Sequence, residues 1–158
     1  MFLKRVAATP TGTRSRPRPR RLGACLADLV PGRSARQAVA AGLHGLGVGQ
    51  EDPVAILANT RLEWVIADLG IMCAGGATTT VYPTTEPADA TFIIADSGSK
   101  VLFAENQAQA AKVDGASLPA LTHVVLLDGA ADPAAAIPQL TLAELEERAP
   151  RRWPPSRS

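Results

Sequence analysis

The chain has 158 residues, which favours a single domain, and its hydrophobic content of 46% is enough for a buried core. Two cysteines are too few for a disulfide framework, and no apolar run has the length expected of a secretory signal or a transmembrane helix. The net charge of +1 divides into +8 for residues 1–50, −11 for 51–147 and +4 for 148–158, so the flanks differ from the middle in partner or in origin.

The two ends of the chain are predicted to be disordered. Residues 1–33 are rich in Arg, Pro and Gly, and residues 149–158 have a similar composition. Neither segment can bury enough apolar surface to offset the entropy lost on ordering. The Arg-rich opening also imitates a mitochondrial transit peptide, but its proline spacing disfavours the amphipathic helix that such a peptide needs. Residues 34–148 are therefore predicted to form the ordered part.

The ordered part opens with a helix. Ser34 can cap a helix that continues to about Leu46, with Val39 and Leu43 on one face. Three glycines in the sequence GLGVG (residues 45–49) then end it. A dinucleotide-binding loop needs a strand before its glycines and a helix after them, which is the reverse order, so these glycines are predicted to be a helix stop with left-handed backbone.

A strand and a helix follow. Val54–Ala58 is a short unbroken apolar run, typical of a strand buried on both faces in a parallel sheet. Thr60 and Glu63 have the spacing of a capping box. The helix that they begin ends at Gly75–Gly76. Its predicted buried stripe consists of Leu62, Val65, Ile66, Leu69, Met72 and Cys73.

The next strand and helix repeat the pattern. Thr78–Tyr82 is β-branched and aromatic, hence a strand that Pro83 ends. Thr84 or Thr85 is predicted to cap the following helix, with Glu86 and Pro87 in its first turn and a stop at Gly98. Its predicted buried face consists of Ala88, Phe92 and Ala95.

Four further elements complete the pattern: a strand at Lys100–Ala104, a short helix at Asn106–Val113, a strand at His123–Leu127, and a helix begun by a capping box of Thr141 and Glu144. Alternation of strands and helices at this spacing predicts an α/β fold with a mostly parallel βαβαβ layered sheet.

Ligands of such sheets bind at the carboxyl ends of the strands. Here these ends carry small polar residues, which are predicted to be helix caps rather than a site: Asn59–Thr60, Pro83–Thr85, Glu105–Asn106 and Asp128–Gly129. The phosphate loop, paired CxxC, HExxH, EF-hand and GxSxG patterns are absent. No catalytic, cofactor-binding or metal-binding residue is therefore assigned. The residues considered and set aside are His44, the edge residue His123, the helix charges Glu63 and Asp68, Cys73 as a core residue, Tyr82 as packing, and Ser97 with Ser99.

Residues 59–106, NTRLEWVIADLGIMCAGGATTTVYPTTEPADATFIIADSGSKVLFAEN, resemble the N-terminal region of the AMP-forming long-chain fatty acyl-CoA synthetases in their EW, GG and YPT spacing. FLKRVAATP, AAGLHGLGVGQEDPVAIL and LTHVVLLDG fit the same family, so the resemblance covers about two thirds of the chain. It implies an incomplete piece of the large N-terminal domain of the adenylate-forming fold. Enzymes of this family join a fatty acid to coenzyme A and convert ATP to AMP and pyrophosphate, with Mg²⁺.

The family's phosphate loop, nucleotide contacts, Mg²⁺-associated acid and mobile-domain lysine would all follow the present C-terminus. The resemblance therefore implies an N-terminal fragment that holds no cofactor and is inactive alone. Two segments depart from the family pattern: the Arg/Pro-rich sequence between Pro10 and Ala38, and the sequence after Glu147. We interpret both flanks as out-of-frame translation of a GC-rich gene, with a natural insertion as the alternative. Reading the coding DNA in all three frames tests this interpretation.

Two further readings stay open. The chain can be a non-catalytic acyl-binding or regulatory module that pairs with a full-length relative, or it can self-associate through exposed faces. A nucleic-acid arm at Arg14–Arg21 is disfavoured, because no aromatic residue is interleaved for base stacking and the middle of the chain is acidic. The expected location is cytoplasmic, with peripheral membrane association as an alternative.

Overall fold

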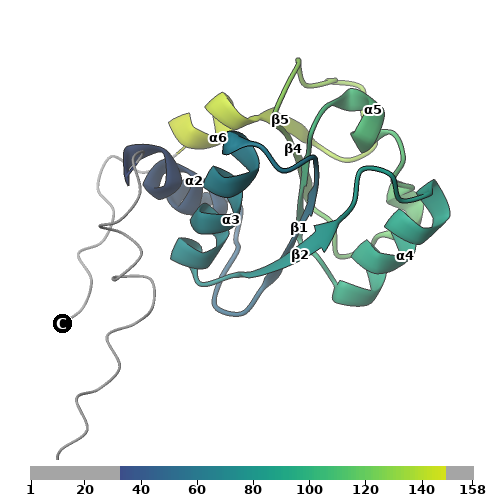
Figure 1. The fold of residues 1–158 in the computed structure, drawn as a ribbon, viewed down its shortest axis with the longest axis horizontal. Helices are drawn as coiled ribbons and strands as arrows, with labels where there is room; N and C mark the ends of the chain where they lie inside the picture. Colours follow the sequence, from purple (N-terminus) through teal and green to yellow (C-terminus); the bar gives the residue numbers. More distant parts are fainter. Residues whose placement is uncertain (1–32, 149–158) are drawn as a thin grey trace, which may run out of the picture.

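A five-stranded parallel sheet forms the centre of the structure, which is a computed structural model that describes residues 33–148, with side chains from residue 35 onward. The strand order is β2-β1-β3-β4-β5, and every neighbouring pair is parallel (Figure 1). The predicted α/β class and parallel sheet are confirmed. The strands are β1 (Pro53–Leu57), β2 (Ala77–Val81), β3 (Val101–Ala104), β4 (His123–Leu126) and β5 (Gln139–Thr141).

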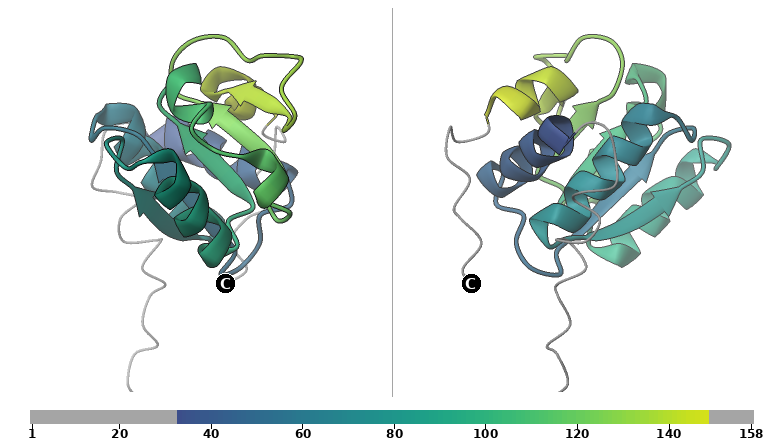
Figure 2. Two further views of the ribbon diagram at one scale, coloured as in Figure 1. Left: turned by 90° about the vertical axis from the view of Figure 1, so that its right-hand side faces the viewer. Right: turned by 60° about the vertical axis from the view of Figure 1, so that its left-hand side comes forward.

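Helices cover both faces of the sheet. Helices α2 (Arg33–Gly45), α3 (Leu62–Ala74) and α6 (Leu142–Glu147) pack on one face, and α4 (Pro87–Ser97) and α5 (Gln107–Ala110) pack on the other (Figures 1 and 2). A short 3₁₀ helix, η2 (Gly115–Ser117), follows α5. The structure is thus a three-layer arrangement, which parallel strands require because each connection must cross a face of the sheet.

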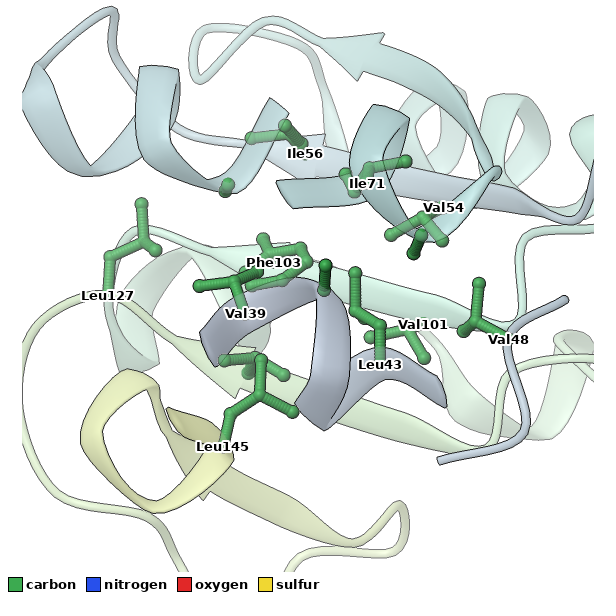
Figure 3. Packing of buried hydrophobic residues seen from close by; sticks show 14 of the residues in the cluster. Val39, Leu43, Val48, Val54, Ile56, Ile71, Val101, Phe103, Leu127 and Leu145 are labelled. Atoms are coloured by element: carbon green, nitrogen blue, oxygen red, sulfur yellow. The ribbon is translucent and has the colours of Figure 1, made fainter. Parts of the chain in front are cut away.

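Alternation along the strands divides the core into two clusters. In β1, Val54 and Ile56 face α2 and α3, whereas Ala55 and Leu57 face the opposite layer. Phe103 of β3 is fully buried at the centre of the first cluster (Figure 3). Because these strands are buried on both faces, they read as unbroken apolar runs in the sequence, which is why their prediction is confirmed.

The predicted buried stripe of α3 is wrong for three of its members, whereas Ile66 and Cys73 of that stripe are partly buried and pack against the core. Leu62, Val65 and Met72 are exposed, and the residues that α3 buries are Ala67, Gly70, Ile71 and Ala74. Helices α2 and α3 lie too close together for larger side chains, since a Cβ added at Gly70 would lie 2.5 Å from Val39 Cγ1. Beside α2 the helix therefore presents the small residue Gly70, and Ile71 is the large side chain that it buries completely.

Helix α4 shows the same reversal. It buries Ala90 and Ile94, whereas the predicted buried residues Ala88, Phe92 and Ala95 are exposed. Ala90 and Ile94 pack against Leu57 and Val81 in the second core cluster. Both helices are apolar on two sides, so the sequence pattern alone cannot decide which side faces the sheet.

One of the two predicted capping boxes is present. Thr141 accepts a hydrogen bond from the Glu144 backbone N–H, and the Glu144 carboxylate accepts one from the Thr141 N–H, so this box is confirmed. The box at Thr60 and Glu63 is wrong, because Arg61 is the N-cap of α3 and its side chain bonds Glu63 instead. The cap of α4 is Glu86 rather than a threonine.

The stops after helices are confirmed where glycine has a positive φ. Gly75 and Gly98 end α3 and α4 in the left-handed conformation, and Gly47 follows α2 with a φ of 85°. The predicted disorder of residues 1–33 and 149–158 lies outside the described part of the chain, apart from Arg33, the first residue of α2. The side chain of Ser34 lies outside it as well, so its capping role stays a prediction.

Candidate functional site

The carboxyl ends of β1 and β3 form the topological switch point of the sheet. The helices that follow these two strands, α3 and α5, lie on opposite faces, and sheets of this strand order bind ligands where the connections diverge. Here a polar contact bridges the two strand ends. The backbone N–H and the side-chain Nδ2 of Asn59 donate hydrogen bonds to Glu105 Oε2 at 2.8 and 2.7 Å.

Arg61 makes a second polar contact, to the residue that follows β4. Its Nε donates to Glu63 Oε2 at 2.6 Å, and its Nη1 and Nη2 donate to the carboxylate of Asp128, which follows β4. These two carboxylates, Glu63 first, raise the pKa of Arg61, and Arg61 in turn lowers the pKa of Glu63. The guanidinium is thus held between two acids and ties the start of α3 to the end of β4.

This polar cluster does not fit ATP or Mg²⁺. It combines the carboxylates of Glu63, Glu105 and Asp128 with one guanidinium, which already binds Glu63 and Asp128, so its net charge would repel a triphosphate. Within residues 33–148, no group of three or more His, Cys, Asp or Glu side chains is arranged to hold a metal ion. What the geometry does support is a positioning role, in which side chains fix the loops at the strand ends.

Other residues considered from the sequence have structural contacts instead of a shared site. Asp68 accepts a hydrogen bond from Thr78 Oγ1 at 2.7 Å and so connects α3 to β2. Glu63 binds Arg61 instead, so the two acids do not share a site. Ser97 Oγ bonds the Ile94 carbonyl oxygen and lies 2.7 Å from Ser99 Oγ, at the end of α4.

The remaining candidates lie apart from the strand-end cluster. Cys73 is half-buried and packs against the core, where burial raises its pKa. His44 is exposed in the last turn of α2. His123 is the first residue of β4, as predicted, and its side chain is half-buried; β4 itself lies between β3 and β5. Tyr82 was predicted to pack, but 74% of its surface is exposed.

A shallow pocket of about 240 Å³ lies on the α5 side of the sheet. Gln107 Nε2 donates to Gln139 Oε1 at 2.5 Å in its wall, and Val113 and Ile137 supply apolar surface. This pocket was not predicted, since its lining comes from α5, η2, β4, β5 and the loop before β5. In the described residues, none of the helices has the length and apolarity needed to cross a bilayer.

Comparison with known proteins identifies the fold and the family. Residues 33–156 match the family described as AMP-binding enzyme, which is most of the chain. The chain belongs to this family. Among solved structures, the anthranilate CoA ligase AuaEII superposes with a TM-score of 0.68 at 22% identity, over 76% of this chain and 23% of that chain. At that identity the likeness shows the fold, and it agrees with the parallel sheet described above.

Several relatives in sequence are named CoA ligases. The long-chain-fatty-acid–CoA ligase FadD15 of Mycobacterium tuberculosis is 37% identical over 106 residues, which are 65% of this chain and 18% of that protein. A second ligase of the same organism, named for a 7a-methyl-1,5-dioxo-octahydro-indenyl propanoyl substrate, is 39% identical over 104 residues, 63% of this chain and 20% of that ligase. The chain therefore spans about a fifth of the length of these relatives. The resemblance to the acyl-CoA synthetases is confirmed.

Arg61 is the residue that the sequence argument missed. A signal was available, because residues 51–147 contain only three Lys or Arg, and one of them, Arg61, comes four residues after the end of β1. A scarce cation at the carboxyl end of a strand, in an acidic segment, is expected to find the acids of neighbouring strand ends.

Proposed function

We propose that residues 34–148 supply the N-terminal part of the large domain of an AMP-forming fatty acid–CoA ligase, as scaffold and without catalytic groups of their own. The complete enzyme would convert a fatty acid, ATP and coenzyme A to acyl-CoA, AMP and pyrophosphate, with Mg²⁺. Membership of the AMP-binding enzyme family and the relation to FadD15 support this proposal. A cytoplasmic location, with peripheral contact to membranes, is part of it.

One observation carries the scaffold role. The strand ends where a ligand would bind are bridged by Asn59 with Glu105 and by Arg61 with Asp128. These side chains satisfy one another and fix the strand ends, so adenylate chemistry would need residues beyond the described part of the chain. In this role, the segment holds the sheet in shape and the reacting groups come from elsewhere.

The test is fatty-acid-dependent exchange of pyrophosphate into ATP by the 158-residue chain, with FadD15 as positive control. We expect exchange at the level of a protein-free blank for the chain and clear exchange for FadD15. Exchange by the chain alone that depends on fatty acid would overturn the scaffold role, because it would require a complete adenylation site.

A non-catalytic acyl-binding or regulatory module is the second candidate. The exposed apolar side chains of α3 and α4 favour it, since they offer surface to an acyl chain, to a full-length relative or to another copy of the chain. Adding the chain to FadD15 during the exchange assay tests this candidate. A dose-dependent change in the rate of exchange by FadD15 supports this candidate. An unchanged rate, with no co-elution of the chain and FadD15, rules out a regulatory module that pairs with FadD15.

A further inference from the structure

The connection between β4 and β5 differs from the other connections of the sheet. Parallel strands are usually joined through a helix that packs on the sheet, and α3, α4 and α5 join the first four strands in this way. Residues 127–138, which join β4 to β5, contain no helix. This segment is called the β4–β5 crossover below. Its position must be fixed by contacts other than those of a packed helix.

Apolar packing does little to fix the β4–β5 crossover. Leu127, its first residue, is buried, and Ile137, near its end, is partly buried against the second core cluster. The residues between these two are small or acidic, and most of them are exposed. A segment with so few buried apolar contacts opens at a low cost in free energy, unless polar contacts hold it.

One polar contact holds the crossover from the α3 side of the sheet. Arg61, the N-cap residue of α3, donates from Nη1 and Nη2 to the carboxylate of Asp128. The backbone N–H of Asp128 donates to the Glu105 carbonyl oxygen at 2.8 Å, so Asp128 is held by its side chain and by its backbone. Because β3 lies between β1 and β4, the Arg61 side chain reaches past the end of β3 to make this contact.

A second set of contacts holds the crossover from the α5 side. Gln107, the first residue of α5, donates from Nε2 to the Ala130 carbonyl oxygen at 3.1 Å and to Gln139 Oε1 at 2.5 Å. Gln139 Oε1 also accepts a hydrogen bond from the Asp132 backbone N–H at 2.9 Å. Since α3 and α5 lie on opposite faces of the sheet, Arg61 and Gln107 hold the crossover from both faces.

We propose that Arg61 and Gln107 are positioning residues, which fix the β4–β5 crossover at the ligand-binding edge of the sheet. They begin the two helices that diverge at the switch point, and the crossover starts at the same edge, at the carboxyl end of β4. This inference rests on the proposed function, because it assigns them a role in the complete ligase. There they act through the crossover and not on a reacting group.

A matched control lies at the opposite end of the strands. Lys100 Nζ donates to Asp52 Oδ2 at 2.7 Å, just before the starts of β3 and β1. Lys100→Met therefore removes one cation and one ion pair, as Arg61→Met does, and leaves the crossover untouched.

Amide hydrogen exchange of the 158-residue chain, resolved by residue with NMR, is the test. The reporters are the backbone amides of Asp128 and Asp132, whose hydrogen bonds are given above. Arg61→Met should speed exchange at Asp128 by about two- to five-fold, as the loss of a half-exposed ion pair predicts. Gln107→Ala should speed exchange at Asp132 by about the same factor, through the loss of a neutral hydrogen bond. Lys100→Met should change neither rate.

A second variant shows whether Arg61 acts through Asp128. Asp128→Asn weakens the same contact from its other end, so the double variant Arg61→Met/Asp128→Asn should exchange at position 128 no faster than Arg61→Met alone. Faster exchange in the double variant, or equal exchange in Arg61→Met and Lys100→Met, overturns the proposal. Far-UV circular dichroism establishes that each variant is folded, and Asp128→Asn replaces Arg61→Met if the latter is not.

Pyrophosphate exchange separates this inference from the proposed function. In a FadD15 chimera that carries residues 34–148 of this chain, Arg61→Met and Gln107→Ala should lower fatty-acid-dependent exchange, and Lys100→Met should not. Equal exchange in the three variants overturns the role at the ligand-binding edge. A folded chimera without substitutions that shows no exchange contradicts the proposed function and this role with it, whereas amide exchange still decides whether Arg61 and Gln107 fix the crossover.

Discussion

Two residues nine positions apart on α3 give a direct test of which side of this helix faces the core. Ile71 is fully buried between α2 and the sheet, whereas Leu62, which the sequence pattern also assigns to the core, is 68% exposed. We consider the substitutions Ile71→Ala and Leu62→Ala. Both remove aliphatic carbons from the same helix and leave its propensity unchanged or slightly better, so their difference reports on burial.

The expected magnitudes follow from the burial. Truncation of a fully buried Ile to Ala typically costs about 2–5 kcal/mol, through lost transfer energy and the cavity that remains. Full burial of a Leu side chain is worth about 1.5–3 kcal/mol, and Leu62 loses only a third of its exposure, so Leu62→Ala should cost roughly 0.5–1 kcal/mol. For a domain whose total stability is on the order of 5–15 kcal/mol, the first change is severe and the second mild.

Urea unfolding followed by far-UV circular dichroism measures both costs, at a concentration where the parent chain is monomeric. We expect the midpoint of Ile71→Ala to fall far below that of the parent and that of Leu62→Ala to lie close to it. Equal losses, or a larger loss for Leu62→Ala, would refute the orientation of α3 described here.

Three further predictions concern the caps, the helix contact and pH. Thr141→Ala should lower the free energy of unfolding by about 1 kcal/mol through loss of the capping box, whereas Thr60→Ala should change it by less than about 0.5 kcal/mol; equal effects in urea unfolding would contradict the assignment of the caps. Gly70→Ala should destabilise by about 1–3 kcal/mol through overpacking against Val39, although alanine favours helices; a gain in thermal midpoint would show that α2 and α3 separate easily. The Thr141 backbone N–H lowers the pKa of Glu144 below 4.5, so the ionised carboxylate stabilises the fold above about pH 4.5, and this stability is lost as pH falls through the folded pKa. Glu144→Gln should thus be less stable than the parent at pH 7 and should approach the parent's stability in acid. A difference in stability between the two proteins that stays constant across pH would show that it does not come from the ionised carboxylate.

Strands β1, β3 and β4 were predictable from the sequence because they are buried on both faces, and β2 was predictable from its β-branched residues. Val54–Ala58 and His123–Leu127 are unbroken apolar runs, and the structure has strands there within one residue. β5 was not predicted, since it has three residues, of which Leu140 alone is buried. The helix faces were not predictable in the same way. In α3 and α4 each inward side combines one isoleucine, Ile71 or Ile94, with small residues, and other large apolar residues lie on the exposed side, so the apolar pattern did not identify the buried face.

The polar cluster could be placed but not assembled from the sequence. The strand ends at Asn59, Glu105 and Asp128 were expected to share one edge of the sheet, and they do. Asn59 contacts Glu105 directly, whereas Asp128 is bound by Arg61, the N-cap residue of α3, which also binds Glu63. The contact between Arg61 and Glu63 was not predicted, because the capping box expected at Thr60 assigned Glu63 a backbone partner instead of the guanidinium.

Exchange of segments between this chain and FadD15 tests the central claim most directly. The 106-residue segment of FadD15 that aligns with this chain is replaced by the corresponding residues of this chain, and fatty-acid-dependent pyrophosphate exchange is measured. A scaffold from the same family should leave measurable exchange, and the same chimera carrying Ile71→Ala should lose it on mild heating. A folded chimera without any exchange would contradict the claim that residues 34–148 are the N-terminal scaffold of such a ligase.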